Sequence, residues 1–246
     1  MSTKPLQGKT ALVTGSSRGI GRAVAERLGR DGASIIVNYT ANPDKAAEVV
    51  RTIQASGSQA IAIQADLSRA EEIQRLFDES IQAFGQLDIV VSAAATSMFK
   101  PLADITPEEF EKVFSLNTRG VFFVLQQAAR KVRDGGRIVQ FSTGGTKMPL
   151  AGGGLYAASK AAGEQLALSL AKEMGPRGVT VNLISPGVTN TDGLIMPQPA
   201  IDALIGQTPL GRLGQPADIA DAVAFLVGDD ARWVTGQNLQ VNGGIL

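Results

Sequence analysis

Seven short apolar runs alternate with helical patterns along this chain of 246 residues, and this alternation is the strongest restriction on its fold. The runs are rich in β-branched residues, as expected for strands of a parallel sheet whose two faces are both covered by helices. We predict strands at Thr10–Val13, Ser34–Tyr39, Gln59–Gln64, Leu87–Ser92, Gly136–Ser142, Val179–Ile184 and Asn238–Val241. The sequence therefore predicts an α/β fold with one doubly wound, seven-stranded parallel sheet of the Rossmann type, in a single domain over residues 1–246.

Two further segments have recognisable patterns. Thr106-Pro107-Glu108-Glu109 combines an N-cap threonine, a proline at the first helical position and a glutamate three residues after the cap, which predicts a helix that directs Phe110, Val113 and Phe114 toward the core. The segment Pro186 to Pro209 reads as a long irregular connection, and a long loop in a compact domain is often a lid. We predict a substrate lid around residues 188–210. Its apolar residues are Leu194, Ile195, Ile201, Leu204 and Ile205.

Composition excludes several kinds of chemistry. The chain has no His and no Cys, which removes the Ser-His-Asp triad, the Cys-His pair and the usual zinc ligands, so we expect no metal site. The 23 basic and 23 acidic residues cancel, which argues against a nucleic-acid or anionic-membrane partner. The start from Met1 to Lys9 has no signal-like apolar run and no segment has the length of a membrane span, so a cytoplasmic protein with a small-molecule partner is expected.

A glycine-rich turn follows the first predicted strand directly and precedes a helical run. Glycines allow the backbone to approach a phosphate closely, and the start of the helix presents free amides and a positive dipole end. The sequence therefore predicts a nucleotide phosphate site. Its residues are Gly15, Ser17, Arg18, Gly19, Ile20 and Gly21.

The end of the second strand indicates which nucleotide is bound. An acidic residue there would accept hydrogen bonds from the ribose of NAD, but this chain has Asn38, Tyr39 and Thr40. With no carboxylate at that position and Arg18 in the preceding turn, we predict NADPH rather than NADH. The alternative for Arg18 is a solvated surface charge.

Tyr156 and Lys160 are four residues apart and therefore share one face of a helix. A positive charge within a few ångströms favours the phenolate and lowers the pKa of a tyrosine. Tyr156 is thus a candidate proton donor, although a tyrosine at a helix start also commonly serves packing alone.

The glycine turn, the Tyr156/Lys160 pair and the segment Asn182 to Gly187 together resemble the short-chain dehydrogenase/reductase family, and the resemblance extends through Gly236 to Gly244. It implies that Tyr156 protonates the substrate oxygen, while Lys160 lowers the pKa of Tyr156 and holds the nicotinamide ribose. It also implies that Asn117 positions a relay water by interrupting its helix; the alternative is an asparagine satisfied by neighbouring backbone.

The same resemblance assigns further contacts with the cofactor. Asp66 and Leu67 are expected at the adenine ring, with Asp66 alternatively a helix cap ahead of Glu71 and Glu72. The remaining cofactor contacts that the resemblance implies are Ser92, Ala93 and Ala94 beside the adenosine, and Pro186, Gly187, Val188, Thr189 and Thr191 at the nicotinamide end.

The chain departs from the family pattern at two places. The family's serine thirteen residues before the tyrosine is replaced by Thr143, which we expect to orient the substrate carbonyl; Ser142 is the alternative, although on a strand it would face the other way. The usual Asn-Asn-Ala-Gly is replaced by Ser92 to Ala95, which predicts a loss of hydrogen bonds between strands.

The combined interpretation is an NADPH-dependent carbonyl reductase that converts a ketone into a secondary alcohol. The chain resembles reductases of polyketide or naphthol ketones and also 3-oxoacyl thioester reductases. An NAD-linked alcohol or sugar dehydrogenase and a non-catalytic NADPH-binding sensor are the alternatives.

Two surfaces bear on partners. A homotetramer is expected by resemblance, with subunit contacts or core packing by Val121, Phe122, Val124 and Leu125. A basic group could meet an acyl carrier protein, but we favour solvated charges at a helix end. That group consists of Arg130, Lys131, Arg133, Arg137 and Arg177.

Overall fold

Seven parallel strands form one sheet in the order β3-β2-β1-β4-β5-β6-β7 in the computed structural model, which describes residues 4–194 and 196–246. This confirms the predicted fold class. The strands are β1 (Thr10–Val13), β2 (Ser34–Tyr39), β3 (Ala60–Gln64), β4 (Ile89–Ser92), β5 (Arg137–Phe141), β6 (Thr180–Pro186) and β7 (Asn238–Val241). β6 runs two residues further than predicted because Ser185 and Pro186 pair with Gln240 and Val241 of β7.

Successive side chains of each strand pack on opposite faces of the sheet, which explains the continuous hydrophobicity of the strands. In β1, Ala11 and Val13 belong to one buried cluster and Leu12 belongs to the other. The same alternation holds in β2, where Ile36 faces away from its neighbours Ile35 and Val37. The chain therefore has two cores, one on each side of a single sheet.

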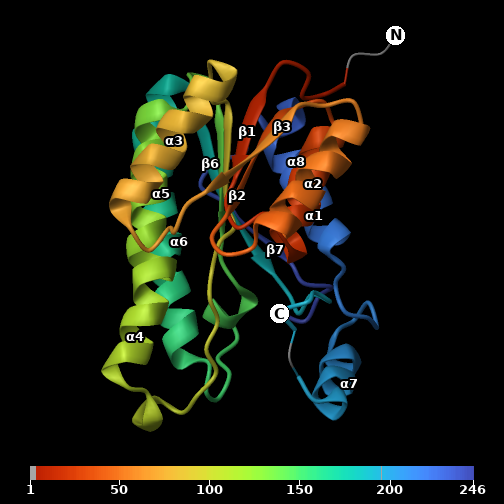
Figure 1. Cartoon of the computed structure of the whole chain (residues 1–246). Coiled ribbons are helices and arrows are strands. Elements are labelled where there is room, and N and C mark those ends of the chain that lie inside the picture. Colours follow the sequence, from red (N-terminus) through yellow and green to blue (C-terminus); the bar gives the residue numbers. More distant parts are fainter. Residues whose placement is uncertain (1–3, 195) are drawn as a thin grey trace.

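Two layers of helices cover these cores (Figure 1). One layer contains α1 (Gly19–Arg30), α2 (Pro43–Ala55) and α8 (Pro216–Val227). The other contains α3 (Ala70–Phe84), α5 (Val121–Lys131) and α6 (Gly154–Met174), with α4 (Pro107–Phe114) at its lower end in Figure 1. Short helical turns are η1 (Leu102–Asp104), η3 (Gly144–Thr146), η4 (Gly175–Arg177) and η5 (Asp229–Ala231).

The strand order reverses direction between β1 and β4, since β2 and β3 extend to one side of β1 and the later strands to the other. In doubly wound sheets, the loops leaving the carboxyl ends of two such strands separate toward opposite faces and leave a crevice for a ligand. The glycine turn follows β1 and therefore lies at this crevice.

The predicted start of α4 is confirmed, but the prediction for its apolar side chains is wrong in part. Thr106 and Glu109 form a capping box, in which the Thr106 hydroxyl accepts from the Glu109 amide at 3.3 Å and the Glu109 carboxylate accepts from the Thr106 amide at 2.9 Å. Val113 is buried, whereas Phe110 is 41% exposed and stacks on Phe114. Only the side of this two-turn helix that carries Val113 packs against the rest of the protein. Phe110 and Phe114 lie outside that side and pack against each other.

The segment Pro186 to Pro209 is not wholly irregular, because it contains helix α7 (Gln198–Gln207). Pro197 and Pro199 start this helix, and Ile201, Leu204 and Ile205 recur at helical spacing. All ten of its residues are at least partly exposed, and Figure 1 shows α7 projecting beyond the sheet. Ile195 lies outside the described residues, and the lid stays a prediction.

Of the four residues proposed for either subunit contacts or core packing, three are buried and one is exposed. Val121, Val124 and Leu125 are buried in the core, whereas Phe122 is 43% exposed and contacts Phe123 edge to face. Within residues 4–194 and 196–246, no helix is both long and apolar enough to cross a membrane.

A π-helical turn, η2 (Ser115–Gly120), joins α4 to α5 and contains Asn117. The expected helix interruption is therefore present, and π-turns occur frequently at functional sites. At its end, Gly120 lies against the loop after β3: a Cβ at this position would lie 2.3 Å from the carbonyl oxygen of Leu67. A glycine is required here because two backbone segments touch.

Gly120→Ala should lower the free energy of unfolding by about 1–3 kcal/mol, since the added methyl group pushes the loop after β3 away. Gly206→Ala is the matched control, because Gly206 lies within helix α7, is not among the glycines with positive φ, and no described heavy atom lies within 4 Å of its added Cβ. Urea unfolding of both variants measures the difference. Equal midpoints for the two variants would show that the contact does not restrict residue 120.

Candidate active site

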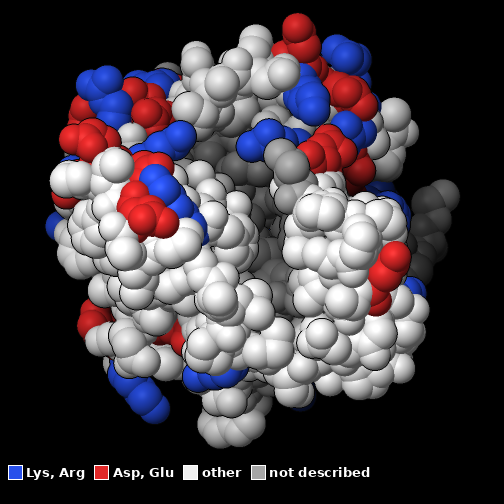
Figure 2. All heavy atoms as spheres, turned by 90° about the horizontal axis from the view of Figure 1, so that it is seen from below, with Lys and Arg blue, Asp and Glu red and all other residues white. Residues whose placement is uncertain are grey.

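A cavity of about 910 Å³ opens at the carboxyl ends of the central strands and contains most of the predicted site. Figure 2 shows the molecule hollowed on this side, with uncharged side chains around the lower part of the hollow and charged side chains beside its upper edge. Its lining includes these predicted residues: Gly15, Ser17, Arg18, Gly19, Ile20, Gly21, Tyr39, Thr40, Asp66, Leu67, Ala93, Ala94, Thr143, Tyr156, Lys160, Pro186, Gly187, Thr189 and Thr191. The volume is in the range of small-molecule sites.

Three predicted residues are outside the described wall of this cavity. Ser92 is buried within β4, and Asn117 is fully buried. The carbonyl oxygen of Val188 accepts from the Gly214 amide at 3.0 Å, so its backbone anchors the neighbouring loop. These residues support the site from behind.

The glycine turn fits tightly against the segment after β4. Gly15 has φ +63°, and a Cβ there would lie 2.9 Å from the Cα of Ala94, so the backbone conformation and the available space both require glycine. The Gly15 amide donates to the Asn38 side-chain oxygen at 3.1 Å. This close approach leaves room for a phosphate against the start of α1.

The expected loss of hydrogen bonds near Ser92 to Ala95 is offset by two other side chains. The Thr14 hydroxyl accepts from the amides of Ala93 and Ala94 at 2.9 and 3.1 Å. The Asn38 amide group also donates to the carbonyl oxygen of Ala65 at 3.2 Å. The ends of β1, β2, β3 and β4 are thus connected without the family's asparagines.

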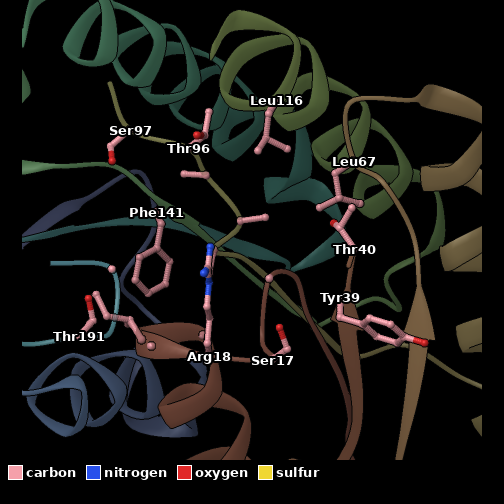
Figure 3. A pocket seen from close by; sticks show the side chains of 18 of the residues that line it. Ser17, Arg18, Tyr39, Thr40, Leu67, Thr96, Ser97, Leu116, Phe141 and Thr191 are labelled. Carbon is pink, nitrogen blue, oxygen red and sulfur yellow. The ribbon is translucent and has the colours of Figure 1, made fainter. Parts of the chain in front are cut away.

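Cationic groups face the phosphate end of the cavity. Arg18 is the N-cap of α1, and Figure 3 shows its side chain pointing into the cavity, whereas the Tyr39 ring turns aside. No ion pair with Arg18 occurs within the part of the chain that the structure describes. Lys45 also lines the cavity and lies 3.5 Å from Asp192, which belongs to the loop after β6. This end of the cavity fits an anionic ligand.

Tyr156 and Thr143 both line this cavity. Burial raises the pKa of Tyr156 above its usual 10.0, and a hydrogen bond with the Thr143 hydroxyl lowers it by less than burial raises it. The predicted lowering of this pKa by Lys160 is therefore wrong for this structure: desolvation of the phenolate has the larger effect. Tyr156 holds its proton at neutral pH.

Lys160 is buried one helical turn after Tyr156. Burial lowers the pKa of its ammonium group from 10.5 to about 8, and the negative charge of Glu164 partly opposes that shift. The ammonium group is therefore still mostly charged at neutral pH, but it is held close to its titration point.

The two candidate hydroxyls after β5 have different partners. Thr143 lines the cavity beside Tyr156 and also accepts from the Gly145 amide at 3.2 Å. The Ser142 hydroxyl donates to the buried carboxylate of Glu164. The geometry therefore favours Thr143 as the group that orients a substrate carbonyl.

Asn117 and Asp66 both have defined contacts. The Asn117 side chain accepts from the Thr96 amide at 2.9 Å and donates to the Thr96 carbonyl and the Ser159 hydroxyl, joining the loop after β4 to α6. Asp66 accepts from the Ser68 amide at 2.9 Å, whereas the N-cap of α3 is Arg69, so the helix-cap alternative for Asp66 is wrong.

Several lining residues were not predicted from the sequence. Lys45, Thr96 and Leu116 line the cavity, and Asn38 and Thr14 hold its floor. The sequence could have indicated the role of Asn38, because a polar side chain within an otherwise apolar strand needs a hydrogen-bond partner. The others depend on how loops approach one another. Within the described ranges there is no cluster of three possible metal-binding side chains.

Fold and cavity together define a dinucleotide-binding oxidoreductase. The family profile described as enoyl-(acyl carrier protein) reductase matches residues 15–246. A hydroxynaphthalene reductase-like protein, Arp2 of Metarhizium brunneum, is 44% identical over 98% of this chain and 96% of its own length. The chain belongs to the short-chain dehydrogenase/reductase family.

Two solved structures are similar over nearly their whole length. A short-chain dehydrogenase from Burkholderia cenocepacia in complex with NADP has a TM-score of 0.94 and 41% identity, covering 98% of this chain and 99% of the other. The angucycline C-6 ketoreductase LanV with bound NADP has a TM-score of 0.94 and 38% identity, covering 100% and 98%.

Lys160→Met should raise stability at pH 7. A lysine whose folded pKa is about 8 and whose unfolded pKa is 10.5 destabilises the fold while it is charged, and this cost disappears as pH rises from about 8 to 10.5. The variant should therefore be more stable than the wild type by about 3 kcal/mol at pH 7, with the difference vanishing near pH 10.5. Urea unfolding across this range measures it. A difference that does not change with pH would contradict the burial argument.

Proposed function

We propose that this protein is an NADPH-dependent carbonyl reductase that converts a ketone into a secondary alcohol. The observation that carries the proposal is the Tyr156 phenol, which lies with Thr143 in the wall of the cavity that begins at the glycine turn. A candidate proton donor and the candidate phosphate-binding turn thus line the same cavity. The family membership and the NADP-bound neighbours support this reading.

The residues of the cavity fit a phosphorylated dinucleotide. Gly15 and the start of α1 would hold the pyrophosphate, β2 ends without a carboxylate, and Arg18 and Lys45 add positive charge to the cavity wall. Asp66 and Leu67 would lie at the adenine end and Thr189 and Thr191 at the nicotinamide end. When bound, the cofactor supplies the hydride.

The protonation states favour reduction. Because burial raises the pKa of Tyr156, the phenol keeps its proton at neutral pH and can give it to a carbonyl oxygen that is gaining negative charge. Thr143 would orient that oxygen, and the Lys160 ammonium would stabilise the tyrosinate left behind.

The substrate that fits best is a cyclic or aromatic ketone. Phe99 is 64% exposed, and its ring centroid lies 5.9 Å from that of Tyr156, so an apolar surface stands beside the proton donor. Leu102 and Leu150, also exposed, lie near the start of the same helix. The naphthol reductase-like relative and the angucycline ketoreductase support the same substrate class.

A 3-oxoacyl thioester on a carrier protein is the weaker candidate. Four of the five basic residues proposed for such a partner lie near carboxylates: Lys131 and Arg177 are paired with Asp78 and Asp134 at 2.5 and 2.7 Å, and two longer contacts, at 3.9 and 3.8 Å, involve Arg133 and Arg137. Arg137 begins β5, so this group lies at the end of the sheet opposite to Thr143. A carrier bound there would be far from the site.

A homotetramer in the cytoplasm remains our proposal from the family resemblance. Trp233 is 96% exposed and Phe225 is 47% exposed, and large aromatic side chains in solvent are typical of interfaces.

The test measures the oxidation of NADPH and NADH with a bicyclic aromatic ketone, a 3-oxoacyl thioester and a simple alkyl ketone. We expect turnover with NADPH, fastest with the aromatic ketone, and at least a ~100-fold loss in Tyr156→Phe, because the proton donor is removed. NADPH binding should persist in that variant. Equal rates for wild type and variant would exclude Tyr156 as the donor. Tight NADPH binding without turnover of any ketone would favour the non-catalytic alternative.

A further inference from the structure

Glu164 is a buried carboxylate that the proposed reaction does not use. It lies on α6, one turn after Lys160 and two turns after Tyr156, so the three side chains share one face of the helix. One oxygen of Glu164 accepts from the Ser142 hydroxyl at 2.5 Å, the Thr146 hydroxyl at 2.7 Å and the Asn238 amide at 3.2 Å. It therefore connects α6 to two other segments, the turn from Ser142 to Thr146 and strand β7.

These partners lie on both sides of Thr143. Ser142 precedes it directly, and its amide donates to the Ile184 carbonyl of β6 at 2.8 Å. Thr146 ends the η3 turn that Thr143 starts, and its hydroxyl also lies 3.0 Å from the Thr143 carbonyl oxygen. The carboxylate thus fixes the segment that presents the Thr143 hydroxyl to Tyr156.

The third donor ties this arrangement to the edge of the sheet. Asn238 is the first residue of β7, and its side-chain oxygen accepts from the buried Ser185 hydroxyl of β6 at 2.7 Å. The network therefore extends from the helix that carries Tyr156 and Lys160, through the turn that carries Thr143, to the strand that leads into the predicted lid.

We propose that Glu164 is a positioning residue of the active site: its carboxylate anchors the turn from Ser142 to Thr146 and places Thr143 against Tyr156. The inference rests on the proposed function, since it concerns the same proton donor. That the residue is a glutamate indicates that its charge has a use, because a neutral glutamine would accept the same hydroxyl bonds without the cost of burying a charge.

The charge has a second consequence at Lys160. Glu164 is the one charged group whose field acts on Lys160 from α6 or from the described strands and turns packed against it, and Tyr156 is the other titratable group on that helix face. Its negative charge opposes the effect of burial and so keeps the ammonium group protonated to higher pH. Position and charge therefore act together.

Three variants separate these two effects. Glu164→Gln keeps the size and the acceptor oxygen but removes the charge, so the alkaline limb of the kcat profile should move to lower pH by about one unit. Glu164→Ala also removes the anchor and should lower kcat by about 10- to 100-fold, with the KM for NADPH changed by less than about threefold. Glu173→Gln, an exposed carboxylate on the same helix, is the control and should behave as wild type.

A measurement without substrate keeps the inference testable whatever the wild type turns over. A double-mutant cycle of Glu164→Gln and Lys160→Met in urea unfolding should give non-additive changes, since the two charges interact. If Glu164→Ala does not fold, Ser142→Ala and Thr146→Val test the anchor, since each removes one donor to the carboxylate and should lower kcat, and a wild-type kcat in both would overturn it.

A wild-type pH profile in Glu164→Gln, together with additive unfolding changes, would overturn the role of the charge. A wild-type kcat in Glu164→Ala would overturn the role of the anchor. A wild type that reduces no ketone would instead count against the proposed function, and the cycle would then test the interaction of Glu164 with Lys160 independently of turnover.

Discussion

The close contact between the glycine turn and the segment after β4 is the constraint on which the site depends. Gly15 can approach Ala94 only because it has no side chain, and Thr14 and Asn38 fix that approach through hydrogen bonds to neighbouring strand ends. The crevice between β1 and β4 therefore has a floor of backbone held by two buried polar side chains. The first turn of α1 lies at this crevice. The phosphate site therefore results from the close contact between the loops that follow β1 and β4.

Burial then sets the chemistry of Tyr156 and Lys160 in the cavity wall. The same low-polarity surroundings raise the pKa of Tyr156 and lower that of Lys160, because both shifts disfavour a charged form. Thr143 and Glu164 each oppose one of these shifts, the first by a hydrogen bond and the second by its charge. The result is a protonated phenol beside an ammonium group that is close to titration. Such a pair is suited to giving up a proton as negative charge develops nearby.

The sequence predicted the fold well because each strand and the turn after β1 have local signals. Thr10–Val13 and Ser34–Tyr39 were predicted with their observed bounds. Phe110 was misplaced because helical spacing does not reveal which side of a short helix meets the protein, and α7 was missed because its prolines suggested a loop. The pKa of Tyr156 was predicted in the wrong direction because spacing to Lys160 is visible in a sequence, whereas desolvation depends on packing from distant segments. The Glu164 network joins residues far apart in the chain and has no local signal.

The proposed reaction is the transfer of a hydride from NADPH, bound in the cavity, to a ketone whose oxygen Tyr156 protonates. A single turnover with NADPH that carries deuterium at both C4 positions tests it most directly, using a bicyclic aromatic ketone and mass spectrometry of the alcohol. The account predicts one deuterium on the carbinol carbon, supplied by the cofactor, while the hydroxyl proton comes from the protein and exchanges with water. An alcohol formed without deuterium, or NADPH that stays bound and unchanged in the presence of every ketone, would contradict it.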